Sequence, residues 1–386
     1  MNRLAPLIMA GVLGFSAPAQ AFEEEKVQFG GFYRNETNWM DMRPNSGLPS
    51  WLNTSDLGLR LKAKINDATD FRGSTRLIYL PEMPQKFTST LNELYMGLNL
   101  NDRAYLKTGK VRVNWGTGMA WNPTDVLQPR KDPTDPTRQE EGTAGVLLDL
   151  PFTFENSEIQ GVTLSGLAAF PENRADGRPT WVGRANLLTS SYDVSALVFQ
   201  DPQRLPKLGF TVSGSLFGEV VAYGEALWKK GTEQYYPTPV GLLPTRNESN
   251  WRSQSFTNWV LGSRYTFPAN VVGSIEYYHN ADGYDPRTMQ DYLTLQGGKT
   301  STMLGMRQNY LLLSAAKGDV QEGLGLSLSF IEGLDDGGWA LIPQLDFSGF
   351  QSSRFYFRAF AFTGKNSEFT LAPQRLVVQG GVQVDF

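Results

Sequence analysis

The sequence predicts an all-β fold: a transmembrane antiparallel up-and-down β-barrel of about eighteen strands, or of about sixteen, with one inward-folded constriction loop. Three observations predict it. Apolar and polar residues alternate with a period of two along most of the chain, short turns alternate with long polar loops, and the longest apolar run, residues 4–15, is too short for a membrane-spanning helix. A water-soluble β-sandwich is the alternative fold, because one face of each strand would then meet water.

The composition excludes several classes of protein. The chain has 386 residues, no Cys, one His and a net charge of −4, and 12% of its residues are aromatic. Without Cys, neither a disulfide scaffold nor a Cys-ligated zinc site can form, and a single His excludes a site built on several histidines. The small net charge and the aromatic content argue against disorder. What remains is a chain large enough for one big core or one large barrel, and we expect no cofactor and no metal.

The first residues have the pattern of a secretory signal peptide. Arg3 supplies a short positive region, residues 4–15 an apolar region, and Ala19-Gln20-Ala21 a small-residue cleavage site. A buried N-terminal helix is the alternative. We expect residues 1–21 to be cleaved after export through the inner membrane, and residues 22–386 to form the barrel. The product then lies in the periplasm, in the outer membrane or outside the cell.

The strands are predicted from the alternation. In residues 57–65 every odd position is apolar, and the even positions are Gly, Arg, Lys and Lys. The same pattern recurs in residues 93–100, 208–216, 219–228 and 376–386. A lipid-facing exterior and a wet lumen produce this pattern in segments of about ten residues.

One segment, residues 103–114, does not follow the alternation. Tyr105, Val111 and Val113 share a face with Lys107, so apolar and charged residues fall on the same side. A β-bulge at Gly109 would restore the pattern, because a bulge adds one residue to one strand and moves the residues after it to the opposite face.

The connections differ strongly in length. The short ones are residues 66–69, 101–102, 190–191, 217–218 and 268–270, and the long ones are residues 42–56, 115–142, 229–254 and 281–306. Placing the two kinds at opposite ends gives about eighteen strands, with both termini at the short-turn end. Short periplasmic turns and long extracellular loops are typical of bacterial barrels.

The C-terminal residues resemble the assembly signal of Gram-negative outer-membrane proteins, in which a polar residue and a glycine precede an apolar residue and a terminal aromatic. Gln379, Gly381, Val384 and Phe386 occupy those places. The mature chain resembles outer-membrane porins, nearest to the substrate-selective and alginate-export-like barrels, and residues 114–125 and 132–138 are similar to a segment of such barrels. The resemblance implies an outer-membrane location, contact with outer-membrane lipid, and the barrel-assembly machinery as a partner. A monomer and a homotrimer both remain open.

Five cations fall on the polar face of two neighbouring predicted strands. They are Arg60, Lys62, Lys64, Arg72 and Arg76. Like charges on adjacent strands repel, so they require water, anions or acids nearby. A water-filled lumen provides this setting, and walls of basic side chains favour anions in a pore. The alternative is that the five cations only make the inner wall hydrophilic, or that they pair with Glu93 and with acids of the loops.

The loop of residues 115–142 is the second candidate. It is long, rich in Pro and dense in charge, and loops of this length in a compact fold are functional or disordered. In porins the third long loop commonly folds inward and narrows the pore, and the resemblance implies the same here; an outward surface loop is the alternative. Its acids would then face the basic wall and set up a transverse field. The candidate residues are Trp115, Asp125, Arg130, Lys131, Asp135 and Arg138.

Catalysis is not expected. The lone His279 shares a face with Tyr277, which predicts an interfacial aromatic position rather than a base. The chain has no Gly-x-Ser-x-Gly elbow in the right context. The carboxylates at 282 and 285, and at 335 and 336, lack the spacing of a calcium loop. The acidic balance and the export signal argue against binding of nucleic acid.

The sequence thus favours an outer-membrane channel through which small polar solutes, preferably anions, diffuse. Two other functions stay open. One is an export conduit for a polymer or a lipid that works with periplasmic partners. The other is an adhesive barrel whose loops 229–254 and 281–306 bind outside partners.

Overall fold

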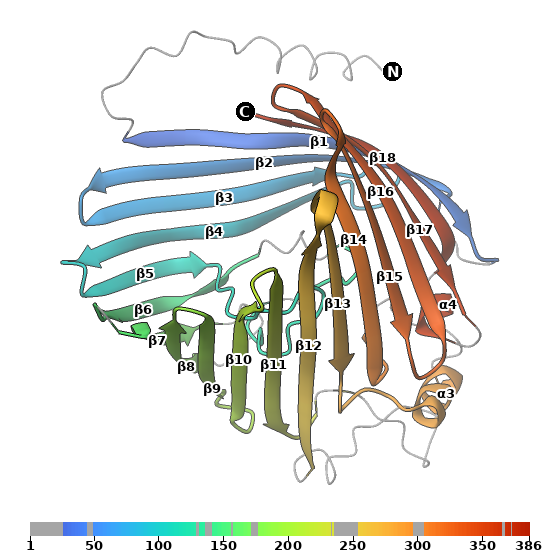
Figure 1. Cartoon of the computed structure of the whole chain (residues 1–386). Coiled ribbons are helices and arrows are strands. Elements are labelled where there is room, and N and C mark those ends of the chain that lie inside the picture. The colour runs from blue at the N-terminus through green and yellow to red at the C-terminus, as the bar shows by residue number, and fades with distance from the viewer. Residues whose placement is uncertain are drawn as a thin grey trace.

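The computed structural model is a closed barrel of eighteen antiparallel strands (Figure 1). It describes residues 26–44, 49–128, 131–135, 141–155, 157–170, 177–232, 234, 254–295, 305–364, 367–371 and 373–386. The predicted signal peptide, residues 1–21, lies outside the described residues. The strand number and the up-and-down order confirm the fold class that the alternation predicts.

The strands are long and follow one another around the barrel in chain order. They are β1 (Val27–Met42), β2 (Trp51–Asn66), β3 (Thr69–Tyr79), β4 (Phe87–Leu100), β5 (Ala104–Val111), β6 (Thr143–Thr153), β7 (Ile159–Ala169), β8 (Thr180–Thr189), β9 (Tyr192–Gln200), β10 (Lys207–Leu216), β11 (Val220–Lys230), β12 (Ser255–Phe267), β13 (Val271–His279), β14 (Asn309–Gln321), β15 (Leu324–Gly333), β16 (Gly338–Phe350), β17 (Ser353–Thr363) and β18 (Gln374–Asp385).

The described residues include the short helices η2 (Pro268–Asn270), α3 (Pro286–Leu295) and α4 (Glu368–Leu371). None of the helices in the described part of the chain has the length and the apolar character needed to cross a membrane. The predicted short turns lie where expected. Left-handed residues such as Asn101 and Asp102 (φ of 56° and 59°) close them, and Asn and Asp tolerate that conformation better than most residues.

The barrel closes between β1 and β18. Thr37 faces Gly380 in this register, and the backbone N–H of Gly31 donates a 2.8 Å hydrogen bond to the carbonyl oxygen of Phe386. A side chain on Gly31 would lie 2.9 Å from the Phe386 ring, so glycine lets the terminal aromatic pack against β1. Both ends of the strand series therefore lie at the short-turn end, as the sequence predicts.

The two faces of the wall differ as the alternation predicts. On β10 Leu208 and Phe210 of the outer face are 50% and 48% exposed, whereas Thr211 on the other face is 1% exposed. On β11 the side chain of Glu225 binds the loop inside the barrel and Tyr223 binds Glu276 of β13, while Trp228 lies on the opposite face. Apolar side chains thus cover the outside and polar ones line the lumen, as the pattern of a transmembrane barrel requires.

The bulge at Gly109 that would have reconciled residues 103–114 with the alternation is not present. β5 pairs with β4 and with β6 without a register shift, although Gly109 has a φ of 129°. Val111 and Val113 face inward and are 1% and 5% exposed. They form part of an apolar cluster against which Trp115, Val126 and Leu127 of the following loop pack. The inner face is apolar at the loop end of β5 because the inward loop covers it there, whereas Lys107 lies farther along the same face, so no shift of face is needed.

Candidate functional site

The segment between β5 and β6 lies inside the barrel, where Figure 1 draws it within the ring of strands. Two carboxylates on the opposite wall bind its backbone. Glu225 on β11 accepts hydrogen bonds from the backbone N–H groups of Thr117 and Gly118, the latter at 2.6 Å, and from the hydroxyl of Thr124 at 2.7 Å. The inward path of this loop confirms what the resemblance to porins implies for the third long loop.

Glu276 on β13 binds the next stretch of the same loop. Its carboxylate accepts the backbone N–H groups of Met119, Ala120 and Trp121, at 2.5, 2.9 and 3.0 Å, and the hydroxyl of Tyr223 at 2.7 Å. Both glutamates are almost fully buried, with exposures of 2% for Glu225 and 0% for Glu276. A buried carboxylate needs such donors, and charge-assisted hydrogen bonds are about twice as strong as neutral ones.

Aromatic stacking supplies a second attachment. The indole of Trp121 stacks on Tyr278 of β13, with ring centroids 5.5 Å apart and an interplanar angle of 14°, and lies 5.5 Å from the ring of Tyr310 on β14. Trp121 is 7% exposed and Tyr310 0%. Aromatic pairs of this kind add about 0.5–1.5 kcal/mol to the burial of their area. The first half of the loop is therefore fixed to the wall.

Lys131 and Asp125 lie in the second half of the loop. The Lys131 ammonium donates a 2.9 Å hydrogen bond to the carbonyl of Gly118, which ties the two halves together. Burial raises the pKa of Asp125 to about 7, against the opposing effect of Lys131. Burial also lowers the pKa of Lys131, although Glu225 and Asp125 act in the other direction.

The described tip of the loop crosses to β17. Asp135 forms a 3.0 Å ion pair with Arg358, whose guanidinium lies 3.6 Å from the carboxylate of Glu36 on β1. Arg358 also donates a hydrogen bond to Gln379 on β18, and the hydroxyl of Tyr356 donates one to Glu36. The loop thus spans the lumen from β11 and β13 to β17.

The ion pairs continue along the wall to β3. Arg34 on β1 lies 2.5 Å from Asp56 on β2, and the guanidinium of Arg76 on β3 holds the same carboxylate with two hydrogen bonds of 2.8 and 2.6 Å. Asp56 is 1% exposed. Arg34, Arg76 and Arg358 are therefore each paired with an acid at the level of the loop.

The other predicted cations lie nearer the short-turn end, on the same inner face. Arg60 faces Ser74 across the β2–β3 ladder, and Lys62 faces Arg72. Arg72 pairs with Asp70 at 3.0 Å, and Lys64 with Asp67 at 2.9 Å; both pairs are largely solvent-exposed. In the part of the chain that the structure describes, neither Arg60 nor Lys62 forms an ion pair.

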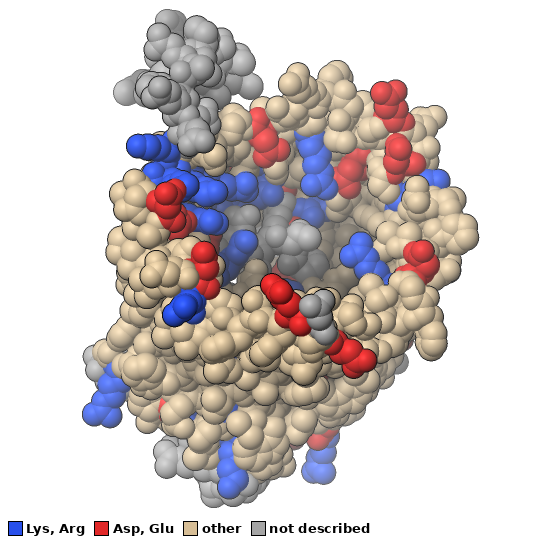
Figure 2. All heavy atoms as spheres, turned by 60° about the vertical axis from the view of Figure 1, so that its left-hand side comes forward, with Lys and Arg blue, Asp and Glu red and all other residues tan. Residues whose placement is uncertain are grey.

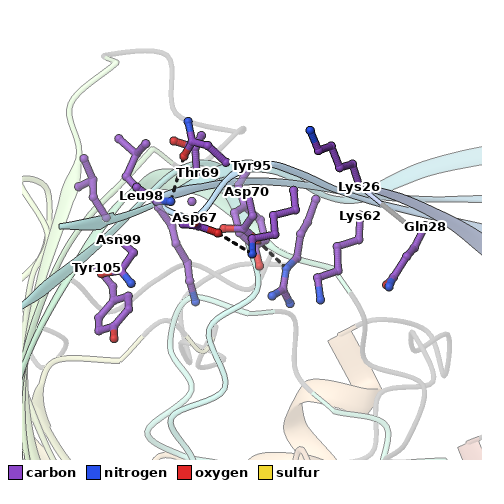
Figure 3. A pocket seen from close by; sticks show the side chains of 17 residues that line it. Lys26, Gln28, Lys62, Asp67, Thr69, Asp70, Tyr95, Leu98, Asn99 and Tyr105 are labelled. Atoms are coloured by element: carbon purple, nitrogen blue, oxygen red, sulfur yellow. Dashed lines mark hydrogen bonds and ion pairs between the residues drawn. The ribbon is translucent and has the colours of Figure 1, made fainter. Parts of the chain in front are cut away.

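A hollow of about 430 Å³ opens at this end of the barrel, between β2, β3, β4 and β5. Figure 2 shows basic side chains along one wall of the open mouth, and Figure 3 shows Lys62 and Tyr105 pointing from the sheet toward the interior. Lys107 on β5 lines the hollow too, with its ammonium 5.7 Å from the centroid of the Tyr95 ring. Its cations are Lys26, Lys62, Lys64, Arg72 and Lys107.

Several candidate residues lie elsewhere than the sequence suggested. Glu93 accepts a hydrogen bond from the backbone N–H of Arg112, and within the described ranges it forms no ion pair with the basic wall. Of the described loop acids, Asp135 pairs with Arg358 and Glu141 with Lys110 rather than with Arg60, Lys62 or Lys64. Trp115 lies under the guanidinium of Arg184 at 5.8 Å. Arg130 and Arg138 lie outside the described residues.

Sequence reasoning missed the acids that bind the loop, the ion pairs along the inner wall and one cation of the hollow. The missed residues are Arg34, Glu36, Asp56, Lys107, Glu225, Glu276 and Arg358. Glu225 and Glu276 could have been found from the sequence, because each is the single acid on the inner face of its strand. Lys107 was hidden because the face of its segment was ambiguous.

The C-terminal positions all lie on β18 or directly after it. Gln379 faces inward and donates a 2.7 Å hydrogen bond to Asn38, and a side chain on Gly381 would collide with the ring of Tyr356. Val384 and Phe386 are exposed on the outer face, at 39% and 55%. His279 contacts Trp259, with ring centroids 5.7 Å apart, in an aromatic group near the strand ends.

Asp282 and Asp336, each from one of the two acid pairs considered above as calcium ligands, bind side chains of the protein. Asp282 accepts 2.7 Å hydrogen bonds from Lys229 and Thr232, and the interactions with Lys229 hold its pKa below the usual range despite burial. Asp336 forms a 3.2 Å ion pair with Arg307. Within the described ranges, no group of three or more His, Cys, Asp or Glu side chains is arranged to hold a metal ion.

The chain was compared with protein families, with curated sequences and with solved structures. A scan against protein-family models finds no match, and a search of curated protein sequences finds none either. Among solved structures, the chain is similar to OccAB1 of Acinetobacter baumannii, with a TM-score of 0.60 and 12% identity over 96% of this chain and 99% of that one.

Two further solved structures show the same likeness. A double mutant of OccD1 (OprD) gives a TM-score of 0.57 at 12% identity, over 96% of this chain and 97% of that one. A triple mutant of the Rhodopseudomonas blastica porin gives 0.50 at 12% identity, over 93% and 100%. The eighteen-stranded barrel of this chain is thus the fold of the porin-type barrels that the sequence resembles.

Proposed function

We propose that the protein is an outer-membrane channel through which small polar solutes, preferably anions, diffuse. The barrel with its apolar outside and polar lumen, the loop that crosses the lumen, and the likeness to a porin support this function. Glu225 and Glu276 bind backbone N–H groups of the loop, and Asp56 binds arginines. The loop narrows the path, and the wall beside it gives the path its charge.

The position of the unpaired cations on the lumen wall is the main support for the proposed anion preference. At the level of the loop, Asp56 neutralises Arg34 and Arg76. Toward the short-turn end, Arg60, Lys62 and Lys107 line the lumen wall, and no carboxylate in the described residues pairs with them. Charge is screened over about 8 Å at physiological salt. Unpaired cations on the wall of a narrow passage therefore attract anions and repel cations.

Ion selectivity in planar bilayers tests this proposal. Under a KCl gradient, the reversal potential of the wild type should indicate a preference for Cl⁻ over K⁺. Lys62→Glu should shift it toward K⁺, because the substitution changes the wall charge by two units. Lys230→Glu, at an exposed position of β11 on the outer face, is the matched control and should leave it unchanged. A wild type without anion preference, unaffected by Lys62→Glu, would refute the anion selectivity.

Location and assembly are part of the same proposal. Residues 1–21 act as a cleaved signal peptide, the barrel-assembly machinery recognises the C-terminal residues that end at Phe386, and the barrel then lies in outer-membrane lipid, as a monomer or a homotrimer. Cell fractionation tests the location. The protein should appear in the outer-membrane fraction, require detergent for extraction, and begin at Phe22 by N-terminal sequencing.

The export conduit is distinguished by the same recordings. A conduit for a polymer or a lipid that needs periplasmic partners should conduct ions poorly when isolated. A diffusion channel should conduct steadily without any partner. Liposome swelling across sugars, amino acids and organic acids then identifies the solute class, and organic acids should enter fastest.

A further inference from the structure

A furrow on the outside of the barrel has no part in solute passage. It has a volume of about 470 Å³ and runs over β13 to β17. Apolar side chains on the outer face line it, among them Leu326, Leu328, Leu345 and Phe357, which are 40–52% exposed. The furrow therefore faces the surroundings of the barrel rather than the lumen.

The sequence explains why the wall is hollow here. Small residues predominate in one row across the strands: Gly273 faces Ala315, Ala315 faces Leu328, and Leu328 faces Pro343. Proline has no N–H to donate, and no ladder partner on β17 is found for Pro343. The register places Ala359 opposite it, which is again small. The small side chains of this row leave a furrow beside the larger side chains of the neighbouring row, which includes Leu326, Leu345 and Phe357.

One cation lies in that next row. Lys317 on β14 faces Val271 on one side and Leu326 on the other, on the outer face, and it lines the furrow. Among the described residues it forms no ion pair. A lysine on the lipid face of a barrel is costly near the membrane centre and costs little near its edge. Its long apolar stem allows the ammonium to reach the polar headgroup region.

Aromatic rings mark that edge. Phe347 and Phe355 face each other in the row adjacent to Leu345, one step nearer the short-turn end than Lys317. Phe350 contacts both, with ring centroids 5.6 and 5.9 Å away and edge-to-face geometry. Aromatic side chains concentrate at the two interfaces of a membrane barrel. Lys317 thus lies beside the aromatic girdle of the short-turn side, with the furrow next to it.

We propose that the furrow is a binding site for a glycerophospholipid of the leaflet on the short-turn side. One acyl chain lies along the row of small residues, and the lipid phosphate pairs with the Lys317 ammonium. An apolar hollow with a cation at its rim complements an anionic amphiphile. This inference rests on the proposed membrane location but not on the proposed solute, because the furrow and the lumen lie on opposite faces of the wall.

Native mass spectrometry of the detergent-purified barrel tests the site. The probe is palmitoyl-oleoyl phosphatidylglycerol, added at increasing concentration. Wild type should retain one lipid in preference to further ones. Ala359→Trp fills the furrow and should abolish this preferential retention. Lys317→Gln should weaken it about fivefold, as expected for one basic side chain beside an anionic headgroup.

Two matched variants on β11 serve as controls. Ala226→Trp adds the same side chain on the outer face away from the furrow, and Lys230→Gln removes a charge elsewhere. Both should retain lipid as the wild type does. Equal retention by wild type, Ala359→Trp and Lys317→Gln would overturn the proposal. So would a change from an oligomer to a monomer in Ala359→Trp without loss of lipid, because the furrow would then be a contact between copies.

Conductance separates this proposal from the proposed function. Ala359→Trp should form channels with unchanged conductance and selectivity, which also shows that it folds. A barrel that retains the lipid but forms no channel contradicts the proposed function and leaves the lipid site supported. A barrel that conducts anions but retains no lipid contradicts the lipid site alone.

Discussion

The carboxylate of Glu276 accepts the backbone N–H of Ala120 at 2.9 Å, which joins the wall of the barrel to a loop 156 residues earlier in the chain. Together with Glu225 it binds the backbone rather than the side chains of that loop, and so fixes its path independently of most loop residues. Without these carboxylates, the N–H groups of the inward loop would be buried inside the barrel without acceptors. Backbone groups that lack a partner when buried are costly.

Removing these carboxylates should release the loop. Glu276→Ala leaves the N–H groups of Ala120 and Trp121 without their acceptor, and each unsatisfied buried donor costs about 1–3 kcal/mol. We expect single channels with larger or noisier conductance, and unfolding at lower urea concentration. Glu219→Ala, at an exposed turn position, is the control and should behave like the wild type. A quiet channel of unchanged conductance in Glu276→Ala would contradict the anchoring role.

The buried and exposed arginines of β17 should differ in their contribution to stability. Arg358→Ala removes the guanidinium that pairs with both Asp135 and Glu36, which is 3% exposed, and breaking a buried pair costs about 3–5 kcal/mol. Arg354→Ala removes a half-exposed pair with Asp346, and such pairs contribute about 0–1 kcal/mol. Equilibrium unfolding in urea measures both variants. Equal losses would mean that the Arg358 network is not needed for stability.

Stability should fall as pH rises through the range in which Asp125 titrates. Burial raises the pKa of its carboxyl from 3.8 to about 7, so between these values the folded state holds a proton that the unfolded state has lost. Bound protons then favour folding, and this contribution, about 4 kcal/mol at most, disappears as pH approaches 7.

Asp125→Asn removes the titration. We expect the variant to lose part of the decline in unfolding free energy between pH 4 and pH 7, and to be more stable than the wild type above that range. Urea unfolding at a series of pH values measures it. Asp132→Asn, an exposed acid of the same loop, is the control. Parallel pH profiles for wild type and Asp125→Asn would contradict the assigned pKa.

Two adjacent glycines of β18 should respond differently to alanine. A Cβ at Gly381 would lie 2.4 Å from the Tyr356 ring, whereas one at Gly380 would meet nothing within 4 Å. Overpacking of a filled site typically costs about 1–3 kcal/mol. Gly381→Ala should therefore lower the unfolding free energy and the yield of heat-modifiable folded barrel in electrophoresis, and Gly380→Ala should change neither. The same yield in both variants would show that the Tyr356 ring moves aside without cost.

The sequence alone was sufficient for the barrel and its two faces. Alternation along residues 57–65 follows directly from the two-residue period of a strand, and the positions of short turns such as Asn101-Asp102 follow from local backbone preferences. The basic wall and the inward loop were also predicted, the latter by resemblance. Residues 103–114 could not be assigned from the alternation, because an apolar patch on the inner face is explained only by the loop that covers it.

Which charges are neutralised was decided by the tertiary structure alone. Nothing local distinguishes Arg76, which Asp56 holds, from Lys62, which no described acid pairs with, since both are cations on the polar face of a strand. Asp135 reaches Arg358, and Glu276 reaches Ala120, only because the loop crosses the lumen. Periodicity determines on which side of the wall a residue lies, whereas the partner of a charge depends on which distant segments closure of the barrel brings within a few ångströms.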